Sequence, residues 1–83
     1  MARINFQAVV LKFLDSIPAG RVKSKNISGG YINMLKLDFE SGQVPVSDLK
    51  EKIIDALGRT GNIGSLDFSD REILEKIIKD ANR

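Results

Sequence analysis

The residues between 31 and 39 divide into two faces with a period of two, as they do in a β strand. One face of this stretch is large and apolar apart from Asn33, and consists of Tyr31, Leu35, Leu37 and Phe39. A half-buried strand requires this period of two. A Gly-Gly pair precedes the stretch and a Ser-Gly pair follows it, so turn residues mark both ends. The sequence therefore predicts a strand over 31–39, around which the rest of the chain is organised.

Two segments on either side of this strand have the apolar spacing of amphipathic helices. In the first, over 6–17, apolar residues recur at i, i+3, i+4, i+7, i+8 and i+11 after Asn5, which is a typical N-cap residue. The second covers 47–57, with Ser47 as its expected N-cap and Gly58 as its expected C-terminal stop. Both segments are therefore predicted to be helices with one buried face.

The remaining elements are two weaker strands and a last helix. Residues 22–28 hold only two apolar side chains, and are interpreted as a strand that either contains a bulge or is an exposed edge. A tight glycine turn would join it to the strand over 31–39. A short strand is expected over 63–68, and a strand stub is conceivable at 2–4. The motif Ser-Asp-Arg-Glu over 69–72 is interpreted as a capping box that starts a helix ending near Ala81.

This order of elements predicts one α+β domain over residues 1–83. We expect a ferredoxin-like two-layer sandwich, in which an antiparallel sheet has helices packed on one face and an extra C-terminal helix is added. The expected core consists of Phe6, Val10, Phe13, Leu14, Leu35, Leu37, Phe39, Leu49, Ile53, Leu57, Leu66, Ile73 and Ile77.

The composition excludes several kinds of chemistry. The chain has 83 residues, 42% hydrophobic and 29% charged, with a net charge of +2 and neither His nor Cys. The commonest general base and thiol chemistry are therefore absent. The acid pairs Asp38/Glu40 and Asp67/Asp70 are interpreted as solvated turn and cap residues. We expect no enzyme, no cofactor, no small-molecule ligand and no membrane insertion, since no apolar run approaches transmembrane length.

A basic edge is the main candidate for a binding site. Arg21, Lys23 and Lys25 alternate along the expected edge strand, and with Arg59 they could contact a nucleic-acid backbone. Because lysines on an edge strand also block unwanted pairing, solvated edge charges are the favoured interpretation. The motif Asn-Ile-Ser beginning at Asn26 is an N-glycosylation acceptor pattern, which matters only in a secreted protein.

Between residues 6 and 70 the order and spacing of the elements resemble a SEA domain. The resemblance uses the strand over 31–39, the helix after it and the segment Gly-Asn-Ile-Gly-Ser-Leu-Asp-Phe over 61–68. It implies an extracellular structural or interaction module, and a cytoplasmic protein is expected otherwise. In that family a Gly-Ser pair at the central turn cleaves itself. Here no hydroxyl residue follows Gly29 or Gly30, so self-cleavage is not expected.

Three functional hypotheses follow. The first is a non-enzymatic structural or interaction module, SEA-like without autoproteolysis, that binds a protein partner or a second copy of itself. The second is a nucleic-acid-binding domain that uses the basic edge, whose binding would weaken steeply with salt. The third is an engineered or designed chain without an evolved function, which the lack of Cys, His and Trp would fit.

Overall fold

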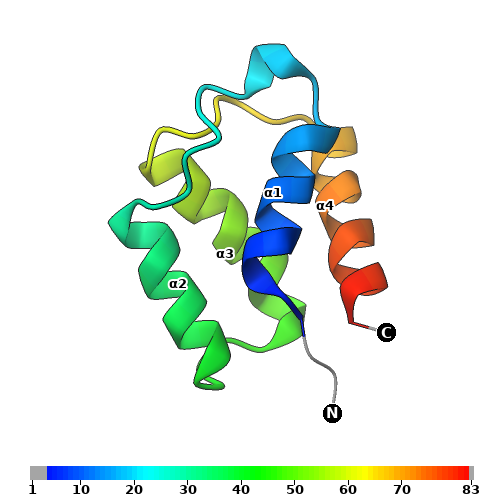
Figure 1. Cartoon of the computed structure of the whole chain (residues 1–83). Helices are drawn as coiled ribbons and strands as arrows, with labels where there is room; N and C mark the ends of the chain where they lie inside the picture. The colour runs from blue at the N-terminus through cyan, green and yellow to red at the C-terminus, as the bar shows by residue number, and fades with distance from the viewer. Residues whose placement is uncertain (1–3, 83) are drawn as a thin grey trace.

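A computed structural model describes residues 4–82, and over that range the protein is a bundle of four α-helices without a sheet (Figure 1). The elements in order are α1 (Phe6–Ser16), the short 3-10 helix η1 (Ala19–Arg21), α2 (Gly30–Glu40), α3 (Val46–Arg59) and α4 (Phe68–Ala81). The predicted α+β, ferredoxin-like sandwich is therefore wrong. The β pairing described within 4–82 is a single antiparallel bridge between Val22 and Ile63. The strand stub considered at 2–4 falls almost entirely outside the described residues.

The expected central strand is helix α2. Its sequence fits a period of two, but Ile32, Leu35 and Phe39 also recur at i, i+3 and i+7, which is a helical stripe. Half of the other residues of the helix, Met34, Lys36, Leu37 and Glu40, are strong helix formers. The helical stripe faces the core, because Ile32 and Leu35 are 2% and 7% exposed. The hairpin over 22–39, on which the SEA resemblance depends, is consequently not found in the described part of the chain.

The three predicted helices are confirmed, with shifted ends. Asn5 is the N-cap of α1, and its side chain accepts a hydrogen bond of 3.0 Å from the backbone N–H of Ala8. Helix α3 begins at Val46 rather than after Ser47, and it runs through Gly58. Helix α4 begins at Phe68 with Asp67 as its N-cap, so the predicted strand over 63–68 is wrong.

The helices pack in pairs, α1 against α4, α2 against α3, and α3 against α4 (Figure 1). Nine of the predicted core residues are buried: Phe6, Val10, Phe13, Leu14, Leu35, Leu49, Ile53, Leu57 and Ile77. Phe39, Leu66 and Ile73 are partly buried against this core. The prediction that Leu37 belongs to the core is wrong, since it is 55% exposed, and the predicted core did not include Ile32, which is buried. Both errors follow from interpreting a helix as a strand, which reverses the inward and outward faces.

Two extended connections lie side by side across one end of the bundle, one from η1 to α2 and one from α3 to α4 (Figure 1). The backbone N–H groups of Lys23 and Ser24 both donate to the carbonyl of Asn62, at 2.8 and 3.1 Å. The N–H of Gly64 donates back to the carbonyl of Arg21 at 3.0 Å. The basic segment that was expected to be a sheet edge is therefore an irregular connection held by the bundle.

Candidate interaction surface

Arg21 joins one connection to the start of α4. Its guanidinium donates to Asp70 at 2.9 Å and forms an ion pair of 3.0 Å with Asp67. The two aspartates also form the capping box of α4, because each side chain accepts from the other's backbone N–H. The hydrogen bond from the Asp70 N–H, followed by the one from Ser69 and then the charge of Arg21, lowers the pKa of Asp67 below its usual 3.8. These two carboxylates therefore hold Arg21 and its connection against the start of α4.

The other residues of the predicted nucleic-acid contact lie apart from Arg21. Lys25 pairs with Asp15 at 2.7 Å, and Lys23 and Lys25 line a shallow groove beside the end of α1. Arg59 lies on a different side, at the groove between α2 and α3, where it bonds to Asp55 at 2.9 Å. Three of the four predicted basic residues, including Arg21, therefore have a carboxylate partner, and the structure does not bring them into one basic surface.

The buried amide of Asn62 holds the connection that carries the predicted glycosylation acceptor. Its Nδ2 donates to the carbonyls of Ser24 and Asn26 at 2.9 and 2.8 Å, while its Oδ1 accepts from the hydroxyl of Thr60. The side chain of Asn26 itself is exposed, and its Oδ1 accepts from the backbone N–H of Ser28. Sequence reasoning missed Asn62, since its partners lie more than thirty residues away along the chain.

The glycine pair that was expected to be a hairpin turn starts α2. Gly29 is the N-cap and Gly30 the first helical residue, and no side chain caps this end. A Cβ on Gly29 would lie 2.9 Å from the Cγ2 methyl of Thr60, closer than van der Waals contact permits. Gly29 is therefore required by the close approach of α2 to the end of α3.

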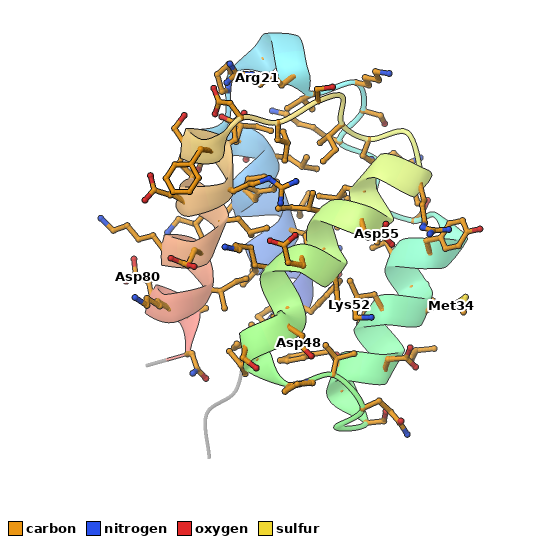
Figure 2. The ribbon with its side chains drawn as sticks, turned by 180° about the vertical axis from the view of Figure 1, so that it is seen from behind. Arg21, Met34, Asp48, Lys52, Asp55 and Asp80 are labelled. Carbon is orange, nitrogen blue, oxygen red and sulfur yellow. The ribbon has the colours of Figure 1, made fainter. Side chains whose placement is uncertain are left out.

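The outer side of α2 exposes three large apolar side chains. Tyr31, Met34 and Leu37 are 51%, 61% and 55% exposed, and their spacing of three residues places them along one side of the helix. We call this surface the α2 outer face. In Figure 2 Met34 projects from α2 away from the rest of the bundle. The opposite side of α2 carries Ile32 and Leu35 into the core, so this helix is apolar on two sides.

Charged groups border the α2 outer face. The guanidinium carbon of Arg59 lies 5.5 Å from the centre of the Tyr31 ring, a cation–π contact. The hydrogen bond and charge of Asp55 raise the pKa of Arg59, which stays protonated. A groove between α2 and α3 is lined by residues that include Tyr31, Asp38 and Lys52. The border of the apolar face is therefore polar and carries both signs of charge.

Another groove lies away from the α2 outer face. It has a volume of about 430 Å³ and lies between α1, the start of α2 and residues 25–28, and its titratable lining groups are Lys25 and Lys36. Within residues 4–82 no three acidic side chains come close enough together to hold a metal ion. None of the helices between Ile4 and Asn82 has both the length and the apolar character needed to cross a membrane.

The chain was also compared with known proteins. No family model, no curated protein and no solved structure matches this chain.

Proposed function

We propose that this protein is a non-enzymatic interaction module that binds another protein molecule through the α2 outer face. The observation that carries the proposal is the exposure of Tyr31, Met34 and Leu37 on a helix whose other side already belongs to the core. A surface helix of a globular protein normally has one apolar stripe, and α2 has two. About half of the surface of the second stripe stays in contact with solvent.

The composition of the surface supports a protein partner. Tyr and Met are enriched where proteins bind each other, while a polar rim surrounds the apolar centre of such interfaces. Here Met34 is central, and Arg59 and Asp38 lie at the border. Tyr31 is held by its contact with Arg59, so part of the surface is ordered before any partner binds.

A photo-crosslinking amino acid at position 34 tests the proposal in cells that produce the chain. Phe68 supplies the matched control, because it is 74% exposed and lies on α4, away from the α2 outer face. We expect illumination to link position 34 to a protein, either a second copy or a different one, and to give little product from position 68. Equal products from both positions, or no product from position 34, would contradict the proposal.

A further inference from the structure

We infer that the occupant of the α2 outer face is a second copy of this chain, packed antiparallel about a two-fold axis at Met34. This inference rests on the proposed function and names its partner. Two observations carry it: the charges at the ends of α2, and the spacing of the three exposed residues about Met34.

The charges of α2 are placed against its own helix dipole. Helices favour acidic residues in the first turn and basic residues in the last. Helix α3 follows this rule with Asp48 and Arg59, and α4 has Asp70 in its first turn and Lys79 in its last. Helix α2, like α1, has no acid in its first turn and no base in its last, and both of its acidic residues lie near its C-terminus. Asp15 at the end of α1 pairs with Lys25, whereas none of the ion pairs described within residues 4–82 includes Asp38 or Glu40. The charges at the C-terminal end of α2 therefore lack a partner among the described residues of the chain.

An antiparallel second copy supplies the missing charges at both ends. Asp38 and Glu40 follow Met34 and Leu37 by four and three residues, so they flank the C-terminal end of the α2 outer face. Arg59 lies at the other end, over Tyr31. Running two α2 helices in opposite directions brings Arg59 of each copy to the acidic end of the other, and it also places opposite dipole ends together.

Arg59 has hydrogen-bonding capacity for such a contact. Its Nε donates to Asp55, and the guanidinium also interacts with the side chain of Tyr31. A guanidinium has five N–H donors, so these contacts leave further donors available. The side chain is 57% exposed, which lets it reach a neighbouring molecule.

The spacing of the apolar residues is symmetric in the same arrangement. Met34 lies midway between Tyr31 and Leu37, so a two-fold axis at Met34 packs each Tyr31 against Leu37 of the second copy. The surface is then complementary to itself, as a two-fold interface requires. A parallel pair would instead set Asp38 and Glu40 beside their own copies, and like charges would repel. The contact is small, so we expect a weak dimer whose population depends on concentration.

Cysteine crosslinking tests the arrangement directly, because the chain has no native Cys. Single variants Tyr31→Cys, Met34→Cys, Leu37→Cys and the control Phe68→Cys are oxidised as purified proteins, after circular dichroism confirms that each is helical. We expect Met34→Cys to form disulfide dimers at least about tenfold faster than Phe68→Cys, since association raises the effective thiol concentration. Tyr31→Cys and Leu37→Cys should dimerise slowly alone and rapidly when mixed.

The other outcomes overturn the inference in distinguishable ways. Comparable rates for all three α2 variants alone would indicate parallel packing. Rates equal to that of Phe68→Cys, together with a monomer mass in sedimentation equilibrium at the highest soluble concentration, would exclude the second copy. In that case a crosslink from position 34 to a different protein in cells would leave the proposed function standing, and its absence would remove both.

Discussion

Helices α2 and α4 differ in how their ends are completed. The start of α4 has a reciprocal capping box, Asp67 with Asp70, and Arg21 bonds to both carboxylates. The start of α2 has Gly29 as its N-cap and no side chain that caps it. Helix α4 buries three large apolar side chains and exposes one, whereas α2 buries two and exposes three. The caps and buried side chains of α4 are explained by the fold of the single chain, whereas the exposed apolar side chains of α2 are not.

This difference shows where stability and binding are located. A helix of eleven residues whose N-terminus has no side-chain cap is marginal alone, so α2 depends on the packing of Ile32 and Leu35 against the bundle. Its outer face is free to serve another molecule. Breaking contacts of α4 should therefore reduce the free energy of unfolding, while changing the outer side of α2 should reduce association instead.

The largest contrast is expected between two leucines. Leu74 of α4 is 0% exposed and Leu37 of α2 is 55% exposed. Leu74→Ala should lower the free energy of unfolding by about 3 kcal/mol, because it leaves a cavity in the core. Leu37→Ala should lower it by less than about 0.5 kcal/mol. Urea unfolding at low protein concentration measures both, and equal losses would show that the two faces of α2 are wrongly assigned.

Removing the contacts of Asp70 at the start of α4 should give the next largest effect on stability. Asp70 is 1% exposed and bonds to Arg21 and to the backbone N–H of Asp67. Asp70→Ala removes both bonds, so we expect a loss of about 2 kcal/mol in urea unfolding. Asp80→Ala on the exposed end of the same helix is the control, with a change of at most about 0.5 kcal/mol. Similar effects of the two changes would mean that the contacts of Asp70 contribute little to the free energy of unfolding.

A side-chain N-cap cannot simply be added to α2, because the methyl group of Thr60 occupies the space beside Gly29. Gly29→Ser places a Cβ against the Thr60 methyl, and we expect it to cost about 1 kcal/mol through overpacking. Thr60→Ser removes that methyl and keeps the hydroxyl, which donates to the carbonyls of Ala56 and Leu57. In that background Gly29→Ser should gain about 0.3 kcal/mol as an N-cap. A double-mutant cycle in thermal unfolding would refute this if the two effects simply add.

The start of α4 should also respond to pH. The folded chain lowers the pKa of Asp67 below 3.8, mainly through the N–H of Asp70. Its contribution to stability is therefore complete above the unfolded pKa and is lost as pH falls through the lower, folded value. Asp67→Asn keeps a good N-cap but cannot titrate, so it should lose less stability than the wild type between about pH 5 and 3. Identical pH profiles would exclude this role.

The smallest effect on stability is expected from the charges at the C-terminal ends of α2 and α4. Glu40→Lys should raise the stability of the monomer by about 0.5 kcal/mol, because it places a base at the end of α2. The matched change Lys79→Glu in α4 should lower stability by about the same amount. Thermal unfolding at low concentration measures both. A loss of stability in Glu40→Lys would mean that Glu40 has a favourable contact within one chain.

The sequence could predict the helices whose apolar residues fit one period only. In α1 and α3 the stripe through Phe13 and through Ile53 has no competing alternation, so type and buried face are both correct. The segment over 31–39 fits both periods, and the flanking glycines favoured the wrong one. Of these glycines, Gly29 is explained by Thr60, a residue 31 positions away, which no local pattern reveals.

The same ambiguity prevented the sequence from predicting the α2 outer face. A strand places Tyr31 and Leu37 in the core, and only the helix turns them outward beside Met34. The partners of the basic residues were hidden for a different reason. Asp70 lies 49 residues from Arg21, so their ion pair depends on how the connections cross the end of the bundle.

A dilution series of amide NMR spectra of the unmodified chain tests the central claim most directly. On raising the concentration, we expect shifts at Tyr31, Met34, Leu37 and Arg59, with the signals of α4 around Phe68 unchanged. This would place self-association on the α2 outer face without any substitution. Spectra that do not change up to the solubility limit, or shifts centred on α4 or on the connections, would contradict the account.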